Sequence, residues 1–264
     1  MARHPVVVAY NATDEAADGL ALADLLVHLT GADLLVARVL RNMVERPVQG
    51  LPEQREIRRQ IMHTRQAVVA AIPDVADADI VPLLDPTLAK SLHELAESQE
   101  AAYLVVGSTH LSGLGRRLLG GSAQLIVDGA RCPVAVASPG FRSVREIVPL
   151  VVSVAYDGKP QSRDALGVAA SLAAAARAAL RVVTVGDDVP DDLPGVRLPP
   201  PTEVERVRLS GDARHALVDQ TANTGLLVMG SHGRGPVRRA LLGSVSAHVI
   251  HHAHCPVVVC PPRA

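Results

Sequence analysis

The sequence predicts an α/β protein of two tandem domains, each a doubly wound parallel sheet of five strands with helices on both faces. Short apolar runs alternate with helix-like segments along the chain of 264 residues, which is typical of this architecture. The second half repeats residues of the first half at fixed offsets, which indicates a duplication. Apolar residues make up 48% of the chain and aromatic residues 2%, so the core must consist of Val, Leu, Ile and Ala.

The first half contains five predicted strands and the helices that connect them. The helix at 14–30 places Leu20 and Leu25 on one apolar stripe, and the helix at 53–71 ends before Pro73, which cannot continue it. The predicted strands are 5–10, 34–40, 80–84, 103–106 and 133–137. The predicted helices are 14–30, 53–71, 88–98 and about 122–130.

The internal repeat defines the domain organisation. Matched residues lie 146 positions apart early in each half and 123 positions apart later: Tyr10 with Tyr156, Leu20 with Leu166, Gly107 with Gly230, and Cys132 with Cys255. The second half therefore lacks 23 residues between its second and third strands, where the first half has its helix at 53–71. Five prolines between Gly186 and Glu203 argue against a long helix there. We expect domains at 1–140 and 141–264, a linker at 138–144, a strand at 147–156, and one helix fewer in the second domain.

A glycine-rich segment follows the strand predicted at 226–229. Gly230, Gly233, Gly243 and Ser244 have the spacing G-x2-G-x9-G-S. Glycines let the backbone turn its N–H groups toward a ligand, and Gly243 and Ser244 stand at a helix N-terminus, whose dipole attracts anions. Val245 and Ser246 continue the same helix start. The alternative is that these glycines only form a tight connection between strand and helix.

The spacing differs from a Walker loop, which ends in Gly-Lys-Ser/Thr, and from the Rossmann fingerprint. It resembles the nucleotide-binding signature of the universal stress protein family, and all four fixed positions match. The resemblance implies a strand order of 3-2-1-4-5, a role in stress response or signalling, and ATP as the ligand, with Mg²⁺ as a candidate companion ion. In such a sheet the ligand lies at the carboxyl ends of the strands, between strands 1 and 4.

The resemblance also implies two further contacts. Asp157, after the first strand of the second half, matches an Asp that ATP-binding members place near adenine or ribose. Val185, at the end of the second strand, matches a position whose backbone faces adenine. Taken alone, Asp157 is equally typical of a turn before Gly158, and Val185 of core packing.

The first half carries a weaker copy of this pattern. Asn11 stands where Asp157 stands, His110 replaces Gly233, and Gly121 replaces Ser244, although Ser122 follows it. Gly107 and Gly120 match Gly230 and Gly243. A side chain at His110 can block the close backbone approach that a phosphate needs, or can itself donate to a phosphate. We therefore expect weaker ATP binding, or none, in this half.

Composition excludes several classes of protein. A net charge of −1 and a pI near 6.8 argue against binding to nucleic acid or to an anionic membrane. The three cysteines form neither a CxxC pair nor a secreted framework, and no signal sequence follows Met1, so we expect a cytoplasmic protein. Arg177 and Arg181 interrupt the apolar tract 166–185, which is therefore not a membrane span.

Catalytic and metal sites have little support. His248 and His252 share a helix face at i, i+4, but a solvated helix end explains them better than zinc, and no metal site is predicted. Paired carboxylates, a Cys/His dyad and a Gly-x-Ser-x-Gly elbow are missing from the sequence. We expect a binding protein; a slow ATPase or phosphotransferase and a nucleotide-free interaction scaffold are the alternatives.

Two expectations concern assembly. The fifth strands are short apolar edges that must be paired, and in the family they mediate dimer contacts, so we expect them to pair the two halves within the chain. The missing helix should leave an apolar patch between strands 2 and 3 of the second half, covered only in part by the proline-rich segment 189–201. Through that face we expect a homodimer or an unidentified protein partner.

Overall fold

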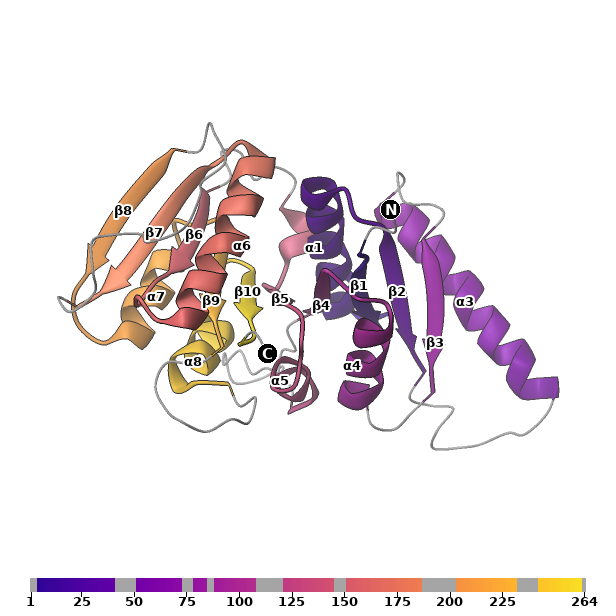
Figure 1. The fold of residues 1–264 in the computed structure, drawn as a ribbon. Coiled ribbons are helices and arrows are strands. Elements are labelled where there is room, and N and C mark those ends of the chain that lie inside the picture. The colour runs from indigo at the N-terminus through magenta and orange to yellow at the C-terminus, as the bar shows by residue number, and fades with distance from the viewer. Residues whose placement is uncertain are drawn as a thin grey trace.

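Ten strands form one continuous sheet in the order β3-β2-β1-β4-β5-β10-β9-β6-β7-β8 (Figure 1). The computed structural model describes residues 4–40, 51–72, 78–84, 88–107, 121–144, 151–186, 203–231 and 242–262. In the first half the strands are β1 (Val6–Tyr10), β2 (Leu34–Val39), β3 (Asp79–Leu83), β4 (Tyr103–Gly107) and β5 (Val134–Ala137). In the second half they are β6 (Val151–Ala155), β7 (Ala179–Val185), β8 (Val204–Leu209), β9 (Leu226–Gly230) and β10 (Val257–Cys260).

Within each half the strands are parallel and follow the predicted order 3-2-1-4-5. The two halves meet where β5 and β10 pair antiparallel, with Ala135 opposite Val258. The prediction that the fifth strands join the halves is confirmed. The two five-stranded sheets are consequently not separate, and the division at residue 140 stays a prediction.

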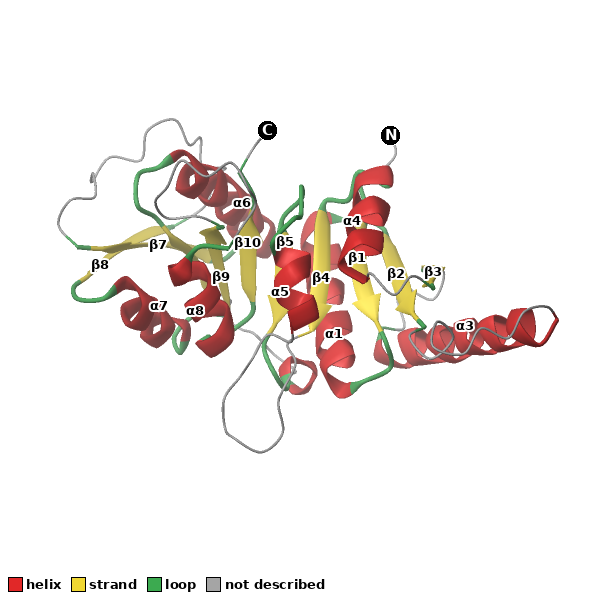
Figure 2. Ribbon diagram, turned by 90° about the horizontal axis from the view of Figure 1, so that it is seen from below, coloured by secondary structure: helices red, strands yellow, loops and turns green. Residues whose placement is uncertain are grey.

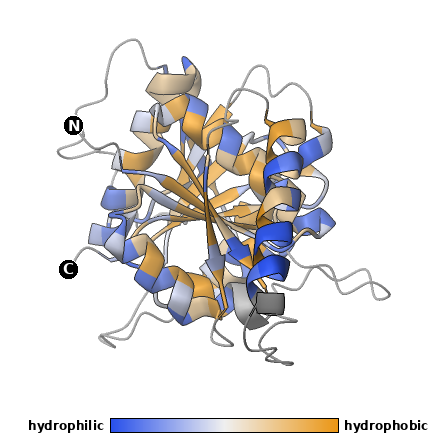
Figure 3. Cartoon of the chain, turned by 90° about the vertical axis from the view of Figure 1, so that its right-hand side faces the viewer, coloured by the Kyte–Doolittle hydropathy of each residue, from blue (hydrophilic) through white to orange (hydrophobic). Residues whose placement is uncertain are grey.

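Helices cover both faces of the sheet, as predicted (Figure 2). One face packs against α1 (Asp14–Thr30), α3 (Leu51–Ala71) and α6 (Pro160–Ala176). The other face packs against α4 (Leu88–Ser98), α5 (Gly121–Val127), α7 (Ala213–Thr221) and α8 (Ser244–His252). Because side chains alternate along a strand, Val6 and Val8 belong to the first core and Val7 to the second. The inner strands are accordingly mainly apolar on both sides, while many of the polar residues lie on the helices (Figure 3).

Local signals set the helix ends. Thr13 caps α1 by accepting a hydrogen bond from the N–H of Ala16 at 3.3 Å, and Gly31 ends that helix in the left-handed conformation. Pro160 occupies the first turn of α6, where no N–H is needed. Arg177 ends α6 at a φ of 52°, so the apolar tract 166–185 divides into a helix and a strand. None of the helices in the described ranges is long and apolar enough to cross a membrane.

In the second half, the predictions for the first strand, for a missing helix and for the proline-rich segment each involve residues outside the described ranges. Of the strand predicted at 147–156, β6 covers Val151–Ala155 and ends one residue before the predicted end, while residues 145–150 lie outside the described residues. Residues 187–202, where a counterpart of α3 would lie, are outside the described residues, so the missing helix stays a prediction. The proline-rich segment 189–201 lies outside the described residues, so its predicted strap is not tested.

The predicted apolar patch between β7 and β8 is wrong for the residues that the structure describes. Leu180 and Val182 on β7 are 0% and 2% exposed. On β8, Val204 pairs with Leu180 and is partly buried. Arg206 pairs with Val182 and Arg208 pairs with Thr184, so two of the three β8 residues on that face are arginines. The sheet edge is thus charged, which disfavours edge-to-edge association.

Candidate functional site

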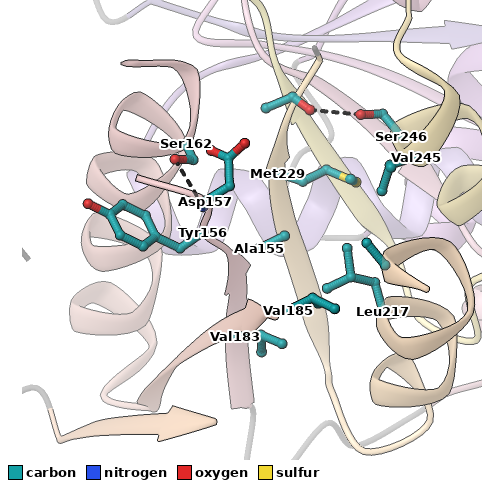
Figure 4. A pocket seen from close by; sticks show the side chains of 12 residues that line it. Ala155, Tyr156, Asp157, Ser162, Val183, Val185, Leu217, Met229, Val245 and Ser246 are labelled. Carbon is teal, nitrogen blue, oxygen red and sulfur yellow. Dashed lines mark hydrogen bonds between the residues drawn. The ribbon is translucent and has the colours of Figure 1, made fainter. Parts of the chain in front are cut away.

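A cavity of about 130 Å³ opens at the carboxyl ends of the strands in the second half (Figure 4). It lies on the α7/α8 face of the sheet, at the ends of β6, β7 and β9, where the chain order reverses. This is the position at which open α/β sheets bind ligands. Its lining consists of Ala155, Tyr156, Asp157, Ser162, Val183, Val185, Ala213, Leu217, Met229, Gly230, Val245 and Ser246.

The walls of the cavity are mainly apolar. Val185 from β7, Met229 from β9, Leu217 from α7 and Val245 from α8 surround it (Figure 4). The ring of Tyr156 points away from it, toward the α6 face (Figure 4). Such a surface suits a flat apolar or aromatic group better than a charged one.

Asp157 supplies a carboxylate at the rim of the cavity. Its Oδ1 accepts a hydrogen bond from the N–H of Lys159 at 3.1 Å, and its Oδ2 contacts the ammonium of Lys159. The hydroxyl of Ser162 accepts from the N–H of Asp157 at 3.3 Å. Burial opposes the charge on Asp157, but the hydrogen bonds from Lys159 and Ser162 outweigh it and lower the pKa of the carboxyl. The site therefore presents an ionised carboxylate whose charge is balanced by a neighbouring lysine.

The N-terminus of α8 adjoins the cavity and carries the end of the glycine-rich motif. Gly243 is the cap residue and has no side chain to satisfy the first N–H groups of the helix, while Ser244 follows it and is exposed. Ser246 is 3% exposed, and its hydroxyl donates to the carbonyl of Gly230 at 2.9 Å. Ser246 therefore connects α8 to β9 and is already used as a donor. Among the described residues of this helix start, the backbone N–H groups of the first turn and the hydroxyl of Ser244 are the candidate donors for a ligand.

Gly230 has a packing role that spacing alone does not reveal. A Cβ at this position would lie 3.0 Å from the Cβ of Gln161 and 3.3 Å from its backbone carbonyl. At the matched position in the first half, a Cβ on Gly107 would overlap the carbonyl oxygen of Glu15. The first glycine of the motif thus lets the end of its own strand pack closely against a helix, α6 for Gly230 and α1 for Gly107. For this one residue, the contact supports a packing role rather than a ligand-binding role.

The first half repeats the turn at the end of its first strand. Asn11 accepts hydrogen bonds from the backbone and hydroxyl of Thr13 at 3.3 and 2.9 Å, as Asp157 does from Lys159. His110 and Gly120 lie outside the described residues, as does Gly233 in the second half. Ser122 lies in the first turn of α5, and nothing of its side chain is described. The weaker site predicted here stays a prediction.

The structure thus brings together Asp157, Val185, Gly230, Val245 and Ser246, with Gly243 and Ser244 beside them. Sequence reasoning missed several lining residues, including Ser162, Leu217 and Met229. The sequence does carry a signal for Ser162, because a hydroxyl in the first turn of a helix commonly bonds to the preceding turn. Leu217 reaches the cavity only through the packing of α7 against the sheet, which the sequence does not encode locally.

The histidines of α8 form a cluster with α7. The rings of His248 and His252 stack at 4.2 Å, and His215 meets His248 edge-on at 5.1 Å. Nδ1 of His252 lies 2.8 Å from the carbonyl oxygen of His248, so it donates within the helix. In the described ranges, no group of three or more His, Cys, Asp or Glu side chains has a geometry that could hold a metal ion.

Comparison with known proteins gives the family. The universal stress protein family matches residues 2–138 and 196–261 of this chain. One universal stress protein of Mycobacterium tuberculosis (strain ATCC 25618 / H37Rv) is 35% identical over 184 residues, which cover 61% of this chain and 62% of that protein. A second one from the same strain is 27% identical over 217 residues, covering 74% of this chain and 71% of that protein. The match to the first relative therefore spans less than two thirds of its length.

Solved structures agree on the fold. The crystal structure of a universal stress protein from Archaeoglobus fulgidus DSM 4304 superposes with a TM-score of 0.73 and 20% identity, covering 98% of both chains. At that identity the likeness concerns the fold alone. The family match at residues 2–138 and 196–261 covers more than half of this chain, and the chain therefore belongs to the universal stress protein family.

Proposed function

We propose that this protein binds ATP in the second half and acts as a nucleotide-dependent stress-response or signalling protein. The observation that carries the proposal is the apolar cavity, which lies between Asp157 at the end of β6 and the N-terminus of α8. The motif G-x2-G-x9-G-S leads into the same helix, as in the ATP-binding members of the family. Two independent features, a motif and a cavity, thus support one site.

Each part of ATP has a matching surface. The adenine ring fits between Val185, Met229 and Leu217, which lose contact with water when it enters. The carboxylate of Asp157 is placed to accept hydrogen bonds from the ribose hydroxyls. The free N–H groups at the start of α8, with the hydroxyl of Ser244, are the donors for phosphate oxygens.

A divalent ion has less support from protein groups. No cluster of acidic or histidine ligands is found in the described ranges, and the carboxylate of Asp157 is bound to Lys159. Mg²⁺ would therefore enter with the phosphates of ATP, since this ion is commonly held by phosphates and waters. We favour ATP binding over hydrolysis because the carboxylate of Asp157 is engaged by Lys159 rather than free to position a metal ion or a water.

The test is calorimetry of the full chain with ATP, ADP and adenosine. Ala155→Leu places bulk in the cavity, and Ala9→Leu makes the same change at the matched position of the first half. We expect about one ATP per chain, loss of binding in Ala155→Leu, and unchanged binding in Ala9→Leu. Gly233→Asp should also abolish binding, because a carboxylate repels phosphate.

Other outcomes would point to the alternatives. An equal loss of ATP binding in Ala155→Leu and Ala9→Leu would assign sites to both halves. A loss of ATP binding only in Ala9→Leu would place the site in the first half. No heat with any nucleotide, together with no nucleotide detected by mass spectrometry of the purified protein, would favour an interaction scaffold. Release of ADP during the titration would favour the slow ATPase.

A further inference from the structure

A carboxylate from the first half of the chain reaches the start of α8 in the second half. Oδ1 of Asp128, which directly follows α5, accepts a hydrogen bond from the backbone N–H of Leu242 at 2.6 Å. The two residues are 114 positions apart in the sequence. Leu242 immediately precedes Gly243, the cap residue of α8.

Three further hydrogen bonds near the start of α8 join residues of the second half to each other. The N–H of Gly243 donates to the carbonyl of Ser231 at 2.7 Å, and the N–H of Ser231 donates to the carbonyl of Cys260 at 2.9 Å. The hydroxyl of Ser246 donates to Gly230. These bonds hold the start of α8 against the ends of β9 and β10. Asp128 alone among these partners belongs to the other half.

The joined sheet explains how the contact arises. Pairing of β5 with β10 brings α5 and α8 to the same face of the sheet, where Ile126 and Val249 belong to one apolar core. Figure 1 shows the two helices on either side of the β5–β10 pair. The residue at the matched position of the second half, 123 positions after Asp128, is His251. Of these two matched positions, only the one in the first half therefore carries an acidic acceptor.

We propose that Asp128 is a positioning residue for the nucleotide site, through which the first half controls phosphate binding in the second half. The proposal rests on the function proposed above. A hydrogen bond to a charged acceptor is stronger than a neutral one, so this bond fixes the direction of the N–H groups that follow Leu242. Preorganised donors bind an anion without a further ordering cost. The adenine cavity is lined mainly by β6, β7, β9 and α7. From α8 only Val245 and Ser246 are among its lining residues, and the bond of Ser246 to Gly230 holds this part of the helix without Asp128.

The proposal predicts a selective effect on phosphates. Asp128→Ala removes the acceptor, whereas Asp128→Asn keeps an acceptor oxygen and removes the charge. Glu97→Ala is the matched control, because Glu97 is an exposed carboxylate of the same half that pairs with Arg131. In Asp128→Ala we expect ATP affinity to fall by about tenfold, or ~1.4 kcal/mol, and adenosine affinity to stay within about twofold. Asp128→Asn keeps a weaker, neutral acceptor and should give an ATP affinity between those of Asp128→Ala and the wild type, whereas Glu97→Ala should keep ATP affinity within about twofold of the wild-type value.

A second measurement tests the contact without nucleotide. Hydrogen exchange of the Leu242 amide in the full chain should be faster in Asp128→Ala than in the wild type, and unchanged in Glu97→Ala. If wild-type protein binds no ATP, the proposed function fails, while faster exchange still supports the positioning contact. Unchanged exchange, or an equal loss of ATP and adenosine affinity, would overturn the role assigned to Asp128.

Discussion

The carboxylate of Asp18 in α1 holds the backbone of Gly140, 122 residues later in the chain. Its Oδ2 accepts from the N–H of Gly140 at 2.8 Å, and its Oδ1 accepts from the N–H of Arg142 at 3.1 Å. Asp18 is 4% exposed, and Phe141 between these two donors is 6% exposed. The linker predicted at 138–144 is therefore anchored to the first half at this point rather than acting as a free spacer.

Removing this anchor should destabilise the protein. Asp18→Ala leaves two backbone donors without their acceptor, and we expect it to lower the free energy of unfolding by about 2 kcal/mol. Asp18→Asn keeps one acceptor oxygen and should cost less. Asp14→Ala is the control: it removes an exposed ion pair with the same Arg142 and should cost less than about 1 kcal/mol. Urea unfolding measures all three, and equal losses in Asp18→Ala and Asp14→Ala would contradict the anchor.

The turns after β1 and β6 predict opposite effects of exchanging Ala and Gly. Ala12 has a φ of 65°, and Gly158 at the matched position has a φ of 77°. A left-handed conformation costs an L-residue about 1–2 kcal/mol, while glycine loses more entropy on folding. Ala12→Gly should therefore raise the free energy of unfolding by about 0.5 kcal/mol, and Gly158→Ala should lower it by about 1 kcal/mol. Thermal unfolding without nucleotide is the measurement; the same sign for both changes would refute the strain argument.

Two glycines of the second half should respond oppositely to alanine. A Cβ on Gly167, inside α6, meets nothing within 4 Å, so Gly167→Ala should stabilise the protein by about 0.5–1 kcal/mol. A Cβ on Gly230 meets Gln161 at 3.0 Å, so Gly230→Ala should destabilise it by about 1–3 kcal/mol. Both variants are compared by chemical denaturation. Unchanged stability in Gly230→Ala would mean that this glycine serves the ligand rather than the packing of α6.

Local patterns predicted most of the fold. Apolar runs and caps are properties of neighbouring residues, so β1, α1, α4 and β9 lie within two residues of their predicted bounds. The pairing of β5 with β10 followed from a general constraint, since a short apolar edge must be paired. The sequence predicted those residues of the candidate site that stand at the ends of strands, namely Asp157, Val185 and Gly230.

The rest depends on contacts between distant segments. The tie of Ser246 to Gly230 and the reach of Asp128 to Leu242 follow from how helices pack, which residue spacing does not encode. The apolar patch was a different kind of error. The alternation in β8 places Arg206 and Arg208 on the face in question, and this pattern was readable in the sequence.

The histidine cluster between α7 and α8 predicts a loss of stability in mild acid. Burial lowers the pKa of His248, and the nearby His252, His215 and Arg214 lower it further, while Asp212 opposes them. In the unfolded chain a histidine titrates near 6.5. Because the pKa of His248 is lower in the folded state than in the unfolded chain, the unfolded state binds the proton more readily, and protonation favours unfolding.

The sign and the pH window follow from that shift. Stability is complete above about pH 6.5, falls as the pH drops through the lowered folded-state pKa, and levels off below it. His248→Gln should reduce this fall between pH 7.5 and pH 5, whereas His4→Gln, at an exposed site near the N-terminus, should leave it unchanged. Urea unfolding at several pH values gives the slope of the free energy of unfolding against pH. The same slope in wild type and His248→Gln would show that the cluster does not contribute. Since α7 and α8 both line the cavity, a reduced slope would also predict that ATP affinity weakens over the same pH range in the wild type and less in His248→Gln.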